Sequence, residues 1–138
     1  RRRVNHCPFE KAIISGQCDC EHAGRSALGE HLGVTCRGGM VRLNCVTLLE
    51  LLRERSRFAL KVTATEQLPF GKELKVMIGG LQGLQRVVHR DATESRVPNI
   101  HGLIAAAQAQ FGGLASLPFE QVVQGVAAYQ SRRRNNPR

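Results

Sequence analysis

Five cysteines are the residues of this chain whose type and spacing point most directly to chemistry. They are Cys7, Cys18, Cys20, Cys36 and Cys45, and residues 46–138 contain none. Cysteines bind metals as thiolates, and soft sulfur selects zinc or iron–sulfur centres over magnesium or calcium. In a reducing compartment, clustered cysteines bind metal more often than they pair with each other. The sequence therefore predicts a metal site in the first third of the chain.

The spacing of the cysteines favours an iron–sulfur cluster over a single zinc ion. Structural zinc sites usually pair cysteines two to four residues apart, and the nearest approach to this is the single-residue gap between Cys18 and Cys20. Iron–sulfur clusters accept ligands at wider and more irregular spacings. We predict that the ligands are Cys7, Cys18, Cys36 and Cys45, with Cys20 as the substitute for any one of them. If Cys18 and Cys20 lie in an extended segment they point the same way, and then both could ligate.

Other interpretations of these residues stay open at this point. The cysteines could form two disulfides with one thiol left over, or could be small buried hydrophobic residues. His6, His22 and His31 lie in the same segment and could be zinc or Rieske-like ligands, although a histidine taken alone is more often a polar surface or core residue. A nucleophilic Cys20 beside Glu21 and His22 is disfavoured, because acidic neighbours raise a thiol pKa.

The positive charge of the chain lies at its two ends. The net charge is +9, but residues 1–3 and 132–138 supply seven arginines and no acid, which leaves 13 basic and 11 acidic residues between them. Arginine tails can hold an acidic partner or RNA electrostatically, or simply remain solvated. Because the chain has five Phe, one Tyr and no Trp, a surface for base stacking is poorly supplied. Nucleic acid is therefore not the favoured partner.

Hydrophobic periodicity predicts a mainly helical chain. The expected helices cover residues 21–32, 44–63, 81–88, 98–111 and 116–127. We expect the last two to pack as an antiparallel hairpin, since a short connection joins them. The alternating apolar residues of 73–78 predict a short strand. The glycines of 79–83 are interpreted as a turn, and a phosphate-binding loop there is disfavoured because the full nucleotide-binding patterns are missing.

These observations lead to one fold and two functions. The fold class is mainly α, with at most one short strand pair: a single domain (1–138) in which a Cys-rich, loop-dominated segment (4–45) packs on a small helix bundle (46–131). The favoured function is that of a small cytoplasmic iron–sulfur protein or accessory subunit, rather than an enzyme, which transfers electrons and docks on a larger redox protein or complex. The alternative is a zinc-stapled interaction module that binds an acidic protein or RNA through its basic tails. No apolar run is long enough to span a membrane.

Overall fold

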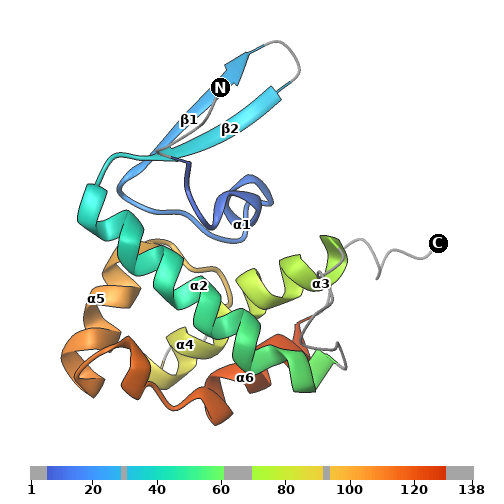
Figure 1. Cartoon of the computed structure of the whole chain (residues 1–138), viewed down its shortest axis with the longest axis vertical. Coiled ribbons are helices and arrows are strands. Elements are labelled where there is room, and N and C mark those ends of the chain that lie inside the picture. Colours follow the sequence, from blue (N-terminus) through green and yellow to red (C-terminus); the bar gives the residue numbers. More distant parts are fainter. Residues whose placement is uncertain (1–5, 29–30, 61–69, 92–93, 130–138) are drawn as a thin grey trace.

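The computed structural model describes residues 6–28, 31–60, 70–91 and 94–129 of the chain. Within these ranges the protein is mostly helical and has a single two-stranded antiparallel sheet, so the mainly α fold class is confirmed (Figure 1). Among the described residues, no helix combines the length and the apolar character needed to cross a membrane. The two basic ends and the connector over 61–69 lie outside the described residues.

The Cys-rich segment contains a short helix and a β-hairpin. Helix α1 (Glu10–Ile14) is followed by strands β1 (Ala23–Leu28) and β2 (His31–Cys36), which pair with Ala23 opposite Cys36. The helix predicted over 21–32 is therefore wrong. β-Branched residues in the second strand and a glycine in the first favour extended structure over a helix.

A long helix leads from the hairpin into the helical part of the molecule. Helix α2 (Gly39–Leu60) begins five residues before the start predicted from the sequence. Its buried face carries Cys45, Leu48, Leu49 and Leu52, at the spacing expected for one face of a helix. The first part of this face points toward the Cys-rich segment, because α2 contacts β2 as well as the helices behind it.

The chain between the connector and the 90s is helical throughout its described part. Helix α3 (Phe70–Leu74), a π-helical turn (Lys75–Gly79) and helix α4 (Gly80–Val88) follow each other directly. Both the strand predicted over 73–78 and the glycine turn predicted over 79–83 are therefore wrong. Val76, Met77 and Ile78 are all buried, so the alternation that suggested a strand does not reflect one buried and one solvated face.

The last two predicted helices are confirmed, but their predicted pairing is not. Helix α5 (Ile100–Phe111) ends at Gly112, which has a left-handed φ of 87°, and a 3₁₀ turn (Leu114–Ser116) leads to α6 (Phe119–Ala128). Helix α6 packs mainly on α4 rather than on α5. A Cβ at Gly83 would lie 2.2 Å from the Val122 carbonyl oxygen, so this glycine is what allows α4 and α6 to approach so closely.

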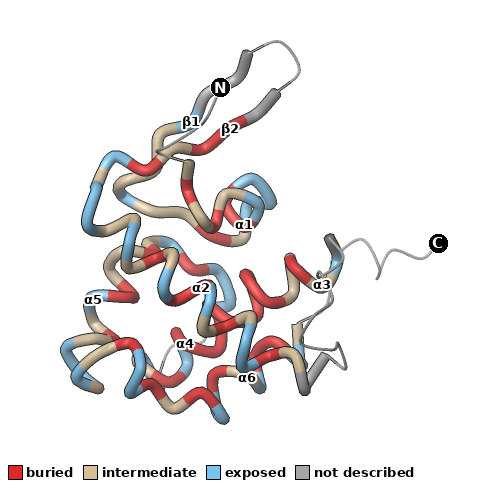
Figure 2. Tube along the Cα trace, viewed as in Figure 1, coloured by how far each residue is buried: buried red, intermediate tan, exposed pale blue. Residues whose placement is uncertain are grey.

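The core lies between these helices and extends to the Cys-rich segment. Figure 2 shows buried residues on the faces that α2, α4 and α6 turn toward one another, and on α1 and the base of β2. Phe9 and Ile13, in and before α1, are fully buried. The Cys-rich segment thus packs on the helices through a continuous apolar cluster.

Candidate metal centre

The first cysteine of the candidate site is held against the hairpin. The backbone N–H of Cys7 donates to the Val34 carbonyl at 2.9 Å, and His6 forms a bridge with Thr35. Cys7 is therefore fixed beside the end of β2, where Cys36 lies. Cys36 shares a strand face with Val34, since residues two apart in a strand point the same way, and both side chains are buried.

The other two cysteines of the candidate site are Cys20, at the start of a turn, and Cys45, in α2. Cys20 lies in a turn before β1, in which its carbonyl accepts the N–H of Ala23 at 3.1 Å. Cys45 lies on the buried face of α2, one turn before Leu48 and Leu49. Four separate segments within residues 7–45 thus contribute one cysteine each.

These four cysteines line one pocket. Cys7, Cys20, Cys36 and Cys45 surround it together with apolar side chains, among them Phe9 and Ile100, and with His22 at its edge. We call this the thiol pocket. All five cysteines of the chain are free thiols in the structure. A pocket with four thiols and apolar walls has the donor set of a zinc or iron–sulfur centre.

Cys18 lies outside the thiol pocket. It is fully buried and forms a bridge with Val97, in a short ladder where the N–H of Asp19 also donates to the Val97 carbonyl at 2.9 Å. The Oδ1 of Asp19 accepts the N–H of Cys20 at 2.8 Å, and the chain turns just after Cys20. Cys20 lines the pocket with Cys7, Cys36 and Cys45, whereas Cys18 does not. Which four bind metal stays a prediction.

Burial raises the pKa values of Cys7, Cys18 and Cys45 and so favours their protonated form. It raises the pKa of Cys7 to about 11, although a backbone hydrogen bond from Phe9 acts in the opposite direction. Burial likewise raises the pKa of Cys45 to about 12, and the neighbouring thiols of the pocket raise both values further. The pKa of Cys18 is raised to about 12, again by burial, but its charged neighbours are Arg96 and Asp19. A metal entering the pocket must displace protons from the thiols.

The spacing of the sulfurs bears on the kind of metal centre. Four thiolates around one zinc ion, each at about 2.3 Å, lie about 3.8 Å from each other. All five cysteines are among the described residues, and no three of their sulfurs lie within 4.8 Å of one another. The space between the side chains has room for at most about one water-sized body. The sulfurs must therefore move inward to bind one zinc ion, or the pocket must widen to accept a cluster.

The histidines considered from the sequence lie in different places. His6 pairs with Glu10, their Nδ1 and Oε1 atoms 3.3 Å apart, and the side chain of His31 is outside what the structure describes. His22 lies at the edge of the thiol pocket. Sequence reasoning missed Ile100 and His101, at the start of α5, because no local pattern connects that turn with the cysteines.

Comparison of the chain with protein-family models, curated proteins and solved structures found no match.

Proposed function

We propose that the protein is a small iron–sulfur protein whose cluster is held by Cys7, Cys20, Cys36 and Cys45. The observation that carries the proposal is that four separate elements bring one cysteine each to a single pocket, while the fifth cysteine is buried elsewhere. The wider spacing of the sulfurs supports a cluster, because its irons take their thiolates at separate corners. An iron–sulfur cluster would supply one-electron transfer.

The side chains around the pocket have distinct roles in this proposal. Phe9 and Ile100 exclude water from one side, which together with hydrogen bonds to sulfur influences a reduction potential. The backbone hydrogen bond from Phe9 to the Cys7 sulfur stabilises the thiolate. Cys20 is half-buried and is the most accessible of the four, so we place the path for electrons to a partner on its side.

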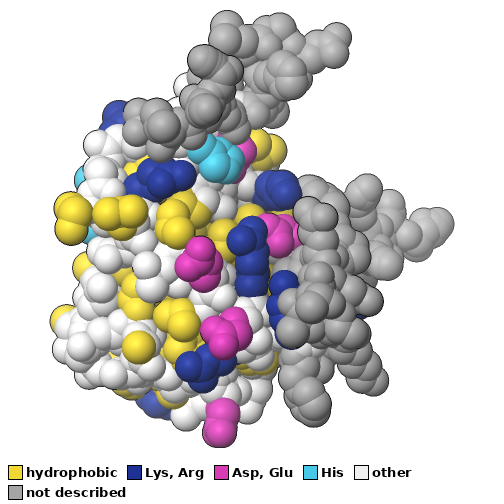
Figure 3. Space-filling view, viewed as in Figure 1, with side chains coloured by type: hydrophobic (Ala, Val, Ile, Leu, Met, Phe, Trp, Pro, Cys, Tyr) yellow, Lys and Arg dark blue, Asp and Glu magenta, His cyan; other side chains and the backbone are white. Residues whose placement is uncertain are grey.

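The larger redox partner is proposed to dock beside the pocket. Met40 and Leu43, in the first turns of α2, are 76% and 54% exposed and lie in the sequence between Cys36 and Cys45. Figure 3 shows hydrophobic side chains on the surface there, with basic ones close by. Arg37 is exposed just before this turn. An apolar pair with a basic neighbour fits an electron-transfer protein whose docking surface has an acidic rim.

A zinc staple is the second candidate, and the small size of the space between the thiols favours it. In that case the ion would supply folding free energy to a segment rich in glycine and poor in large apolar residues. The basic tails, which lie outside the described residues, would then hold an acidic protein or RNA. Either function requires reduced thiols, and we therefore propose a reducing, cytoplasmic location.

One measurement separates the two candidates: the ultraviolet–visible spectrum of anaerobically purified protein, with iron and zinc quantified on the same sample. We expect broad absorption near ~400 nm that bleaches with dithionite, and about two to four irons per chain. A colourless, iron-free protein with one zinc per chain would refute the cluster and support the staple. A protein that binds neither metal would refute both.

A further inference from the structure

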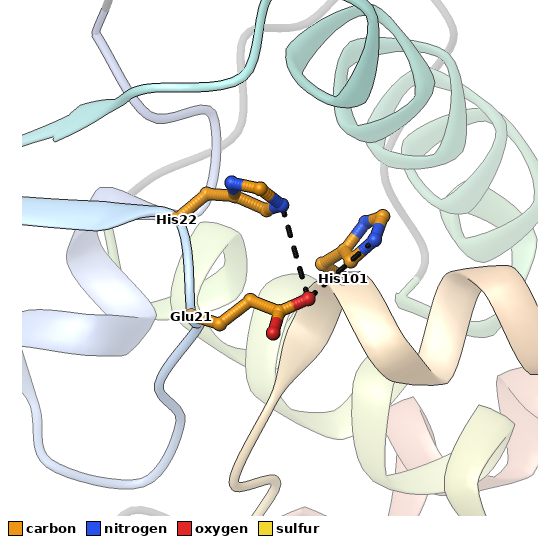
Figure 4. Close-up of side chains that lie close together, drawn as sticks. All are labelled: Glu21, His22 and His101. Carbon is orange, nitrogen blue, oxygen red and sulfur yellow. Dashed lines mark ion pairs between the residues drawn. The ribbon is translucent and has the colours of Figure 1, made fainter.

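A second group of metal-binding side chains lies next to the thiol pocket. Glu21 and His22 lie in the turn after Cys20, and His101 lies in the first turn of α5 (Figure 4). The Nε2 atom of His101 is 3.5 Å from Oε2 of Glu21, and the Nε2 atom of His22 is 3.8 Å from the same oxygen. One ligand atom from each of the three residues lies within 4.8 Å of the other two.

The backbone holds the two segments of this group together. The Asn99 side-chain oxygen accepts the backbone N–H of Glu21 at 3.1 Å, across 78 residues of sequence. The carbonyl of Asp19 accepts the N–H of Ile100 at 2.8 Å. The first hydrogen bond uses the backbone of Glu21 itself, and the second uses Ile100, the residue before His101. The fold therefore holds together the two backbone segments that carry the three side chains, as a pre-formed metal site requires.

The spacing of the three ligand atoms fits one zinc ion. Bonds of about 2.0–2.2 Å to nitrogen and oxygen in a tetrahedron place neighbouring ligand atoms about 3.4 Å apart. The distances of 3.5 and 3.8 Å between the histidine nitrogens and the Glu21 oxygen need only small adjustments. The two imidazole rings meet edge to face, with their centroids 4.7 Å apart.

The accessibility of the group fits a site that exchanges its ion with solvent. The Glu21 side chain is 54% exposed, and those of His22 and His101 are 33% and 29% exposed. Protein ligands would occupy three positions of a tetrahedral ion and leave the fourth for water or an anionic oxygen ligand. Two histidines and one carboxylate with an open position are the ligand set of many catalytic zinc centres.

We propose that Glu21, His22 and His101 form a mononuclear zinc site with one open coordination position. The site is separate from the thiol centre, because it uses nitrogen and oxygen ligands, although His22 also forms part of the edge of the thiol pocket. The bound ion would join the turn after Cys20 to α5. The proposal does not depend on which metal the thiols hold, or on whether they hold any.

The test uses the full chain and Co²⁺ as a spectroscopic probe for zinc, with Zn²⁺ binding measured in parallel by equilibrium dialysis. Cobalt bound by thiolates gives intense charge-transfer absorption in the near ultraviolet, whereas cobalt bound by two imidazoles and a carboxylate gives only weak visible bands. We expect the wild-type protein to show the weak visible bands, together with one zinc equivalent that persists when the thiols are already occupied by metal.

The decisive variant is His101→Gln, because His101 is remote in sequence from every cysteine. It should lose the weak visible bands and bind that zinc equivalent at least about 100-fold more weakly. The matched control is His89→Gln, which changes an exposed histidine at the end of α4 and should bind as the wild type does. Metal at the thiols should be unchanged in both variants.

Equal zinc and cobalt binding by the wild type, His101→Gln and His89→Gln would overturn the proposal, and so would the absence of this zinc equivalent from the wild type. One of these two results is expected if Glu21, His22 and His101 form only ion pairs and bind no metal. Failure of the iron–sulfur proposal has a different signature, since it would appear in iron content and absorption near ~400 nm, which His101→Gln should not alter.

Discussion

Two cysteines separated by one residue provide the sharpest test of the thiol pocket. Cys20→Ser removes one of its four sulfurs, whereas Cys18→Ser changes a thiol that lies outside it. If the pocket binds the cluster, Cys20→Ser should reduce iron to less than about a tenth of the wild-type content per chain, because a serine hydroxyl is a poor replacement for a thiolate. Cys18→Ser should retain its iron.

The cost of Cys18→Ser should appear in stability instead. Its side chain is fully buried, so a hydroxyl there is cut off from water and costs about 1–3 kcal/mol if it finds no partner. For a chain of this length, that corresponds to a decrease in Tm of roughly 4–12 °C. Cys20 is half-buried, so in the metal-free protein its replacement should cost less than that of Cys18.

The assay measures iron and absorption near ~400 nm per chain after anaerobic purification, with circular dichroism melting on the same samples. The measurements are made well below the lower Tm, so that loss of iron reports loss of a ligand rather than unfolding. The opposite result, in which Cys18→Ser loses iron and Cys20→Ser retains it, would show that the thiol pocket is not the site. It would instead favour the set Cys7, Cys18, Cys36 and Cys45.

Three further predictions concern the fold that positions the pocket. Gly83→Ala should lower the free energy of unfolding by about 2–3 kcal/mol, measured by urea titration, because its Cβ would lie 2.2 Å from the Val122 carbonyl oxygen and force α4 away from α6. Glu73→Gln should cost about 1 kcal/mol in the same assay, since it weakens a two-contact ion pair with Arg53 that solvent partly screens. The metal-free protein should lose stability between pH 9 and 12, because burial raises the pKa of Cys45 from 9.0 to about 12 and the unfolded chain therefore ionises first.

Each of the two substitutions has a control in the same chain. Gly71→Ala should have little effect, as a Cβ there would meet no atom within 4 Å, and Glu50→Gln changes an exposed carboxylate on α2. Equal effects of a test variant and its control would contradict the corresponding packing or ion-pair argument. For the metal-free protein, ionisation of one buried thiol should lower the free energy of unfolding by about 1.4 kcal/mol at pH 10. A Tm that does not change from pH 8 to 10 would contradict this prediction.

The sequence allowed the late helices to be predicted because their signals are local. In α5 and α6, apolar residues recur at helical spacing between a proline-containing start and, for α5, a glycine end, and each such signal lies within one element. The partner of α6 could not be predicted in the same way. It depends on how closely Gly83 and Gly125 let two backbones approach, and this is a property of the packed pair.

The two mistaken elements failed for different physical reasons. For residues 21–32, the weak helical stripe competed with the β-branched Val34 and Thr35 just beyond it, and pairing with that second strand settled the structure. For residues 73–78, the side chains from Val76 to Ile78 are all buried. A segment without a solvated face has no informative periodicity, so a π-helical turn and a strand look alike in sequence.

In the candidate site, the type of ligand could be predicted from the sequence, but the positions of the ligands in the fold could not. The cysteines could be recognised as metal ligands from their chemistry and their confinement to residues 7–45. The choice between Cys18 and Cys20 depended on the pairing of Cys18 with Val97, a contact made across the whole chain. Residues 18–20 form no helix or turn, and the turn begins only at Glu21, so local structure alone does not distinguish the two cysteines.

The ladder that buries Cys18 gives this cysteine a structural role in both proposed sites. The N–H of Val97 donates to the Gln17 carbonyl at 3.0 Å. Three residues later, the N–H of Ile100 donates to the Asp19 carbonyl at 2.8 Å. These bonds fix the start of α5 against the turn that carries Cys20. Because Ile100 lines the thiol pocket and His101 follows it, a shift of the ladder would displace a wall of one site and a ligand of the other. Below its Tm, Cys18→Ser should therefore leave metal at both centres and lower only the stability that the two centres share, whereas Cys20→Ser or His101→Gln should remove metal from one centre alone.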